Sequence, residues 1–207
     1  MINNDKSVKA KLSALDIEIR KCNKCSRREQ CPDNLPTIQY NDRNDILFVG
    51  RDPAKNGWRE SGKAFFNVNG GLIPSGKIFD KQLQNIGISI EDINFVELIK
   101  CFPIEGKLRT SLKEEVENCS QWLKMQIQII NPAVIVPMGG PASEFFFHNQ
   151  HGQKLKSLSD YVSGKMITLY EGIPVIPIFH PSPAAQGKNH LNPIILKRIF
   201  SYTGGNS

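Results

Sequence analysis

The sequence has no apolar run long enough to cross a membrane, and its first residues, MINNDKSVKAKLS, lack the apolar core of a signal peptide. We therefore expect a cytoplasmic protein without a membrane partner. It also has no internal repeat and no low-complexity segment, so the 207 residues are expected to fold as one domain. Cysteine is scarce, with five in the chain. In a reducing compartment, such cysteines are expected to be ligands, catalytic groups or core residues rather than disulfides.

The charge balance is basic, with a net charge of +6 and a pI of about 9.1. That balance is compatible with a polyanionic partner such as nucleic acid, although many basic proteins bind none. The basic residues are scattered rather than gathered in a tail, so any binding face must be built by the fold. Nothing in the pattern implies an obligate protein partner, and we expect a monomer.

Short apolar runs alternate with helical patterns along the chain. The runs typical of buried strands are 45–50, 93–99, 133–139 and 175–179, with a small edge strand at 166–170. The stretches that read as helices are 6–21, 75–87, 111–130, 141–148 and 190–200. This alternation predicts a three-layer α/β/α sandwich around a mainly parallel, four-stranded sheet.

We expect three parts within the single domain. Residues 1–44 form an N-terminal helix and a cysteine-bearing arm, residues 45–200 the α/β core, and residues 201–207 a tail. Ligands of such folds bind beyond the carboxyl ends of the strands. The segments at these ends are Gly50 to Pro53, Glu97 to Cys101, Gly139 to Pro141 and His180 to Ser182.

Two of these segments carry side chains with catalytic chemistry. A carboxylate at a strand end, here Asp52, can orient a water or stabilise a developing cation. A histidine, here His180, can donate a hydrogen bond to a developing oxyanion, and Ser182 with the loop amides can hold a phosphate. The plainer alternatives are an ordinary Asp-Pro turn and a proline-stiffened turn with an incidental histidine.

The long loop at 51–74 contains a pair of aromatic residues, Phe65 and Phe66, beside several glycines. An exposed aromatic ring can stack on a nucleic-acid base. The alternative is that the pair belongs to the hydrophobic core.

The cysteines come as a close pair, Cys22-x-x-Cys25, and two distant singles, Cys101 and Cys119. Four thiolates suit either tetrahedral zinc or a 4Fe–4S cluster, and spacing alone does not decide between them. Cys31 is either a fifth participant or a core thiol. Unrelated buried thiols are the remaining alternative.

Taken in order, these motifs resemble the uracil-DNA glycosylase superfamily, most closely its iron–sulfur family 4 branch. The family has a CxxC pair, a GExPG-type strand end, a G-x-P-F loop, an N-x-x-K-C strand end, a later cysteine and an HPS motif. The counterparts here are Cys22 with Cys25, Gly50 to Pro53, Gly62 to Phe65, Glu97 to Cys101, Cys119, and His180 to Ser182. The resemblance implies a structural 4Fe–4S cluster rather than zinc, and DNA as the partner.

The resemblance also implies roles for single residues. Phe65 would stack on an extruded base, because the enzyme must flip the nucleotide to reach its glycosidic bond. His180 would stabilise the negative charge that builds on the departing base, and Gly50 would allow close backbone approach to the sugar or base. The DNA backbone would be held by Ser182 and by the DNA-probing loop after it, which contains Gln186 and Lys188.

The sequence departs from the family at two positions. Arg51 stands where family 4 usually has Glu, and the following Asp52 makes the motif closer to the GQDP motif of family 1. We therefore expect Asp52 to orient the attacking water, with Arg51 in the base-binding set. The family Asn that reads uracil aligns with Glu97, and an ionised Glu cannot donate to uracil O4. A protonated Glu97 instead offers the donor and acceptor that match cytosine N3 and its amine.

These departures lead to one hypothesis and its alternatives. The hypothesis is a DNA glycosylase for a non-standard base, with a modified cytosine favoured and a role in anti-phage defence. The alternatives are an ordinary uracil-DNA glycosylase of base-excision repair, a catalytically silent DNA-binding module, and a zinc-stapled phosphate-binding protein. Glu97 has an alternative of its own, in which it points to Lys100 or Arg51 and another group reads the base.

Overall fold

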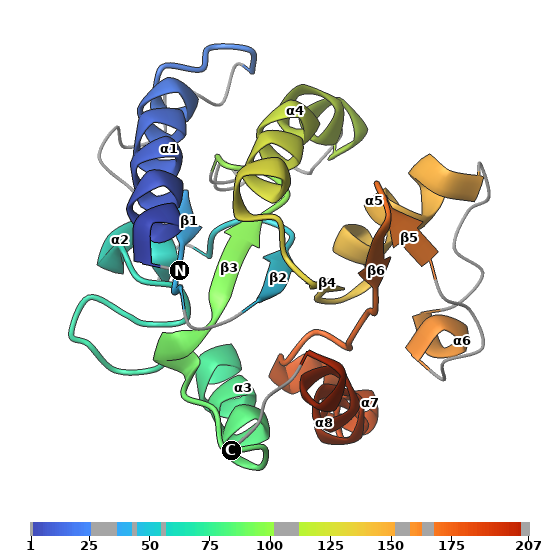
Figure 1. Ribbon diagram of the computed structural model, residues 1–207. Coiled ribbons are helices and arrows are strands. Elements are labelled where there is room, and N and C mark those ends of the chain that lie inside the picture. The colour runs from blue at the N-terminus through green and yellow to red at the C-terminus, as the bar shows by residue number, and fades with distance from the viewer. Residues whose placement is uncertain are drawn as a thin grey trace.

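The computed structural model describes residues 2–25, 37–42, 45–54, 57–101, 112–151, 158–162 and 168–203. Cys31 lies outside the described residues. The molecule is built around one mixed sheet with helices packed on both of its faces (Figure 1).

The sheet has six strands within the described residues. In chain order they are β1 (Ile38–Gln39), β2 (Ile46–Gly50), β3 (Asn94–Glu97), β4 (Val134–Pro137), β5 (Thr168–Tyr170) and β6 (Ile173–Val175). In space their order is β1-β3-β2-β4-β6-β5. The central strands β3, β2, β4 and β6 pair in parallel, whereas β1 and β5 pair antiparallel at the two edges. The predicted mainly parallel sheet is confirmed, but its strand count of four is corrected to six because of these short edge strands.

Within the described residues, the five predicted helices are present close to their predicted ranges, and three short helices of four or five residues were not predicted. They are α1 (Ile2–Arg20), α2 (Trp58–Ser61), α3 (Pro74–Gln84), α4 (Leu112–Ile130), α5 (Gly140–His151), α6 (Leu158–Val162), α7 (Gln186–Asn189) and α8 (Asn192–Tyr202). Short 3₁₀ turns occupy Ile90–Asp92 and Pro183–Ala185. Proline occupies the first turn of α3 and of α8, where its missing N–H costs nothing. None of the helices in the described part of the chain is both long and apolar enough to cross a membrane.

The two faces of the sheet bury separate hydrophobic clusters, as the period-two alternation of β2 requires. Ile46 and Phe48 belong to one cluster, and Leu47 and Val49 belong to the other. The first face is covered by α3 and α8, and the second by α4 and α5, with α1 packed beside α4 (Figure 1). This arrangement is the predicted three-layer α/β/α sandwich.

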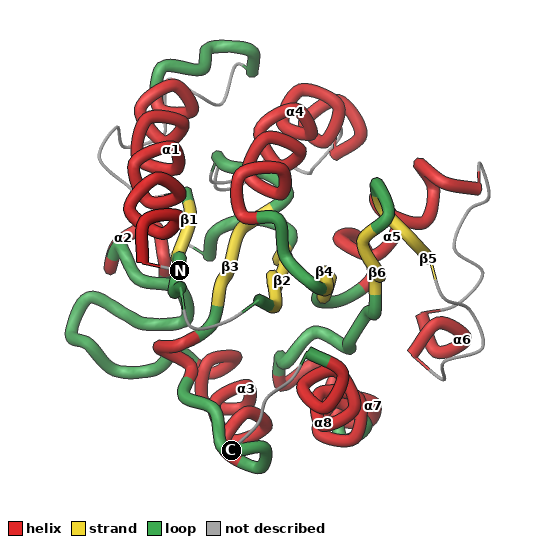
Figure 2. The backbone as a smooth tube through the Cα atoms, viewed as in Figure 1, coloured by secondary structure: helices red, strands yellow, loops and turns green. Residues whose placement is uncertain are grey.

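The segment between β2 and α3 is mostly loop, interrupted only by α2 (Figure 2). The predicted long loop therefore exists, and it starts at the carboxyl end of a central strand. The last predicted strand is shorter than expected, because β6 ends at Val175 and Ile178 then makes an isolated bridge with Met138. The chain thus leaves the sheet just before His180.

Candidate active site

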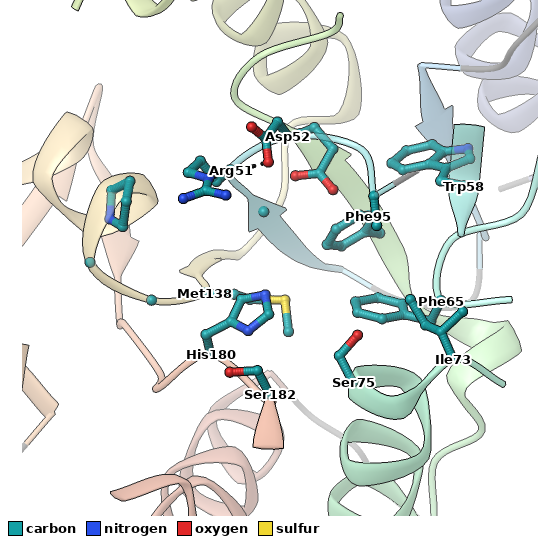
Figure 3. A pocket seen from close by; sticks show the side chains of 16 residues that line it. Arg51, Asp52, Trp58, Phe65, Ile73, Ser75, Phe95, Met138, His180 and Ser182 are labelled. Carbon is teal, nitrogen blue, oxygen red and sulfur yellow. Dashed lines mark hydrogen bonds and ion pairs between the residues drawn. The ribbon is translucent and has the colours of Figure 1, made fainter. Parts of the chain in front are cut away.

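A pocket of about 390 Å³ lies at the carboxyl ends of the central strands (Figure 3). It is closed on one side by the loop before α3 and on another by the segment after β6. Of the predicted site residues outside the cysteine set, those that line it are Gly50, Arg51, Asp52, Phe65, Glu97, His180 and Ser182. Lys188 is exposed on α7, which begins at Gln186, and Lys188 is not part of the lining.

Asp52 and Arg51 form an ion pair at the mouth of this pocket. Arg51 Nε lies 3.2 Å from Asp52 Oδ1, and the side chains are 44% and 9% exposed respectively. The main chain here is tied to the end of β3, because Leu98 N donates to Gly50 O and Ile99 N donates to Arg51 O. In Figure 3 the guanidinium lies between Asp52 and His180. The pair therefore places a fixed positive charge and a largely buried carboxylate side by side above the cavity.

His180 faces the same cavity from the segment after β6 (Figure 3). Desolvation, followed by the positive charge of Arg51, lowers its pKa below the ordinary 6.5, and Asp52 only partly opposes that effect. The imidazole is therefore mostly neutral at pH 7 and can donate one hydrogen bond without carrying a charge. Gly139, at φ 85°, permits this position, because a Cβ there would lie 3.0 Å from the Cβ of His180.

Phe65 forms the wall of the pocket opposite His180 (Figure 3). Its φ of 69° is in the left-handed region, which costs a non-glycine residue about 1–3 kcal/mol. Ring contacts with Phe79 and Phe95, at centroid distances of 5.2 and 4.8 Å, and the hydrogen bond from Ile73 N to Phe65 O hold it there. Gly76 is also required, since a Cβ at that position would lie 2.6 Å from Phe65 O. The ring is therefore fixed as a flat apolar wall.

Glu97, the last residue of β3, is a buried carboxyl group at the wall of the pocket. Its Oε2 is buried, and no residue in the described part of the chain makes a hydrogen bond to it. Burial, followed by the nearby charge of Asp52, raises the pKa of Glu97 well above 4.5, and Lys100 and Arg51 oppose this only in part. The carboxyl is packed directly under Gly50, where a Cβ would approach Glu97 Cδ to 2.7 Å.

Lys100 is buried beside this strand end but does not pair with the carboxyl of Glu97. Its ammonium donates to the main-chain O of Glu97 and to Gln126 Oε1, the latter at 2.5 Å. Burial lowers the pKa of Lys100 to about 8. Gln126 in turn donates to Thr37 O at 3.2 Å, so this chain of bonds links the end of β3 to α4 and the segment before β1.

Comparison with known proteins agrees with this geometry. The family model for the "Uracil DNA glycosylase superfamily" matches residues 37–202. The chain belongs to the uracil-DNA glycosylase superfamily. A type-4 uracil-DNA glycosylase of Thermotoga maritima is 34% identical over 155 residues, covering 74% of this chain and 73% of the relative. Another, of Saccharolobus solfataricus, is 32% identical over 171 residues, covering 81% and 74% respectively.

A third relative in the superfamily, a type-4 uracil-DNA glycosylase of Archaeoglobus fulgidus, is 30% identical over 168 residues, covering 80% of this chain and 78% of the relative. The predicted resemblance to the iron–sulfur branch is therefore confirmed. So is the predicted enzyme class, a DNA glycosylase.

Three of the four cysteines of this superfamily member, Cys22, Cys25 and Cys119, lie within electrostatic range of one another, and Cys101 directly follows Lys100, whose main chain contacts Cys119. Cys119 is buried, and the N–H of Lys100, the residue before Cys101, donates to its sulfur. Burial is the main cause that raises the pKa of Cys119, and Cys25 and Cys22 add to it, so their charges lie within range. Asn118 donates to Cys25 Sγ at 3.4 Å. All four are free thiols.

Four cysteine thiols are chemically suitable ligands for a metal centre. In the structure, however, they do not form a complete coordination site. Across the described ranges, no group of three or more His, Cys, Asp or Glu side chains is arranged to hold a metal ion. What the structure does establish is that the CxxC pair at the end of α1 and Cys119 on α4 are brought within electrostatic range from distant parts of the chain.

Several residues of this glycosylase line the pocket and were not predicted from the sequence, among them Trp58, Ser75, Phe95 and Met138. The period-two alternation of β3 could have found Phe95, since it shares a face with Glu97. Met138 directly follows β4, a position that the strand-end rule covers. Trp58 is buried with an unpartnered indole N–H, and no sequence signal distinguishes it from an ordinary core tryptophan.

Proposed function

We propose that this DNA glycosylase flips a cytosine-type base carrying a modification out of DNA and hydrolyses its N-glycosidic bond, in defence against phages with modified DNA. The observation that carries the proposal is the buried carboxyl of Glu97 at the wall of the pocket. Burial raises the pKa of Glu97, which favours its protonated form, and that form offers one donor and one acceptor.

Cytosine is favoured because a carboxylic acid and the amide of the family Asn differ in how well they bind the two bases. An Asn amide already pairs with uracil, so a carboxylic acid gains nothing there beyond the same two hydrogen bonds. Cytosine N3 is a far more basic acceptor than uracil O4, so it makes the stronger bond with an acid proton, while the cytosine amine donates to the other oxygen. A cavity of about 390 Å³ is within the range that holds drug-sized ligands, which leaves room for a substituent on the ring.

In the proposed reaction, the ring of Phe65 stacks on the flipped base. The neutral imidazole of His180 donates a hydrogen bond to the base oxygen O2 as the bond to the sugar breaks, which stabilises developing charge. Asp52 holds the water that attacks C1′ and stabilises the positive charge on the sugar. Arg51 supports the base site, and the DNA backbone is held by Ser182, Gln186 and Lys188.

The four cysteines are proposed to hold a 4Fe–4S cluster. The type-4 relatives belong to the iron–sulfur branch, and Cys22, Cys25 and Cys119 of this chain, all free thiols, lie within electrostatic range of one another. Cys22, Cys25, Cys101 and Cys119 are the proposed ligands. When bound, the cluster supplies a structural link between the N-terminal arm and the end of β3 and takes no part in the hydrolysis. Zinc is the less favoured occupant.

A panel of oligonucleotides tests the base. Purified protein is incubated with single- and double-stranded DNA carrying uracil, hypoxanthine, cytosine, hydroxymethylcytosine or glucosylated hydroxymethylcytosine, and the free base is measured. We expect faster release of a modified cytosine than of uracil, and no release of cytosine. Glu97→Asn, which restores the family residue, should shift the preference toward uracil by slowing release of the modified base.

The same panel decides between the proposal and its alternatives. Robust uracil release that Glu97→Gln leaves unchanged would identify an ordinary uracil-DNA glycosylase, a reading that the names of the type-4 relatives favour. A silent DNA-binding module would release no base, and Asp52→Asn and His180→Ala would leave its DNA binding unchanged.

A further inference from the structure

One oxygen of the Glu97 carboxyl, Oε2, is buried without a hydrogen-bond donor among the described residues. The nearest ammonium, that of Lys100, is occupied by the main-chain O of Glu97 and by Gln126. The guanidinium of Arg51 is engaged with Asp52 at 3.2 Å. The other titratable group on the pocket wall, His180, approaches from the segment after β6.

Such an environment favours the acid over the carboxylate. A buried charge without hydrogen bonds is far more costly than a buried carbonyl oxygen without one. Asp52, on the adjacent strand end, adds a negative charge that disfavours a second carboxylate nearby. Oε2 is packed under Gly50, and the residue as a whole lines the pocket, so a base bound there would lie beside the protonated carboxyl.

We propose that Glu97 is the general acid of the reaction and gives its proton to N3 of the departing cytosine-type base. This inference rests on the proposed function, since uracil carries a hydrogen at N3 and has no basic atom there. As the C1′–N1 bond breaks, its electron pair moves onto the base, and the proton from Glu97 makes the leaving group neutral. Water adds to C1′ and gives a proton to Asp52.

The step balances with one water consumed, an abasic site and a neutral base formed, and one proton returned through solvent from Asp52 to Glu97. It also explains why an acid is useful here. A cytosine-type base is a poorer leaving group than uracil when it departs as an anion, because its amine withdraws less charge than a second carbonyl. Protonation at N3 removes that disadvantage, and a positioned general acid contributes about 10²–10⁴-fold in rate.

Glu97→Gln separates proton transfer from base reading. The amide of Gln offers the same donor and acceptor as a protonated Glu, so it preserves the pairing with N3 and the amine but transfers no proton. In single-turnover assays on the modified-cytosine oligonucleotide that the panel identifies, we expect DNA affinity within about twofold of wild type and a rate lower by about 10²–10⁴-fold. The wild-type rate should fall as pH rises through the pKa of Glu97, and that limb should be absent in the variant.

A second substrate tests the same step on the unaltered protein. In the 3-deaza analogue of that base, N3 is replaced by C–H, so no proton can be received there. We expect the wild-type rate on the analogue to fall to about the rate of Glu97→Gln on the normal base. The analogue test applies whether or not the variant folds. The thermal midpoints of wild type and variant at pH 5 and pH 8 provide the check on folding.

The experiments distinguish failure of the proposed function from failure of the acid role of Glu97. If no cytosine-type base is released, the proposed function is wrong and the acid role falls with it. If a modified cytosine is released but Glu97→Gln is equally fast, only the acid role is wrong, and Glu97 reads the base without transferring a proton. If the 3-deaza analogue reacts at the wild-type rate, the contact of Glu97 with N3 is wrong as well, although the glycosylase activity on modified cytosine stands.

Discussion

The contact between Gly50 and Glu97 yields the sharpest stability prediction, through Gly50→Ala. A Cβ at this position would lie 2.7 Å from Glu97 Cδ, closer still to Glu97 Oε2, and 2.8 Å from Phe95 Cζ. Carbon atoms attract one another at about 3.5–4.0 Å and repel strongly at these distances. One neighbour is a buried carboxyl and the other a buried ring, so neither can move without disturbing the pocket.

Overpacking of this kind costs about 1–3 kcal/mol. For a chain of 150–250 residues, each kcal/mol lowers Tm by about 2–4 °C, so Gly50→Ala should lower Tm by about 2–12 °C. Because the displaced group is the proposed base reader, base release should fall at least about tenfold, which corresponds to about 1.4 kcal/mol in the barrier. Calorimetry and single-turnover assays on the oligonucleotide panel measure the two effects.

Two comparisons make the result specific. Gly187→Ala is the matched control, since a Cβ at that position of α7 meets no atom within 4 Å, and its effect on stability should be within about 1 kcal/mol. In a double-mutant cycle, Gly50→Ala should cost less in a Glu97→Ala background, where the carboxyl that it would strike is absent. Equal costs in both backgrounds, or full activity of Gly50→Ala, would refute the packing of this carboxyl under Gly50.

Two further predictions concern the neighbours of this site. Anaerobically purified protein should be brown with an iron–sulfur absorbance, and a colourless zinc protein would contradict the cluster. Cys119→Ser should remove the colour and lower Tm, whereas Asp52→Asn should remove activity and leave the colour. Arg51→Gln should raise the pKa of His180, because the positive charge of Arg51 lowers it, and NMR titration of the imidazole would show no change if the two side chains were farther apart in solution.

Glu97 also makes stability depend on pH in a defined direction. Its pKa in the folded protein is raised above the ordinary 4.5, so its protonated form is favoured by folding. The corresponding stability is complete below about pH 4.5 and is lost as pH rises through the folded pKa. We therefore expect the thermal midpoint of Glu97→Gln to rise relative to that of wild type between pH 5 and pH 8.

Much of the fold follows from local patterns in the sequence. Apolar runs such as 45–50 and 133–139 are typical of strands buried on both faces, and both form central strands of the sheet. The edge strand β5 agrees with the predicted edge strand at 166–170 over the described residues, whereas β1 was missed. β1 has only two residues and pairs on one side, so its sequence carries too little periodicity to be distinguished from loop.

The meeting of the site residues was also predictable, because the carboxyl ends of parallel strands share one edge of a sheet. That rule alone brings Asp52, Glu97 and His180 to one pocket, and motif order indicates the superfamily. The sequence by itself therefore determined which residues meet and what family of chemistry they serve.

Only the tertiary structure decided the state of those residues. The unpartnered oxygen of Glu97, its raised pKa and its contact with Gly50 depend on the depth of burial and on charges contributed by other elements. The engagement of Lys100 with Gln126, which leaves that carboxyl without a cation, joins segments far apart in the chain. Electrostatic free energy depends on distance and solvent exposure, and both quantities exist only once the chain has folded.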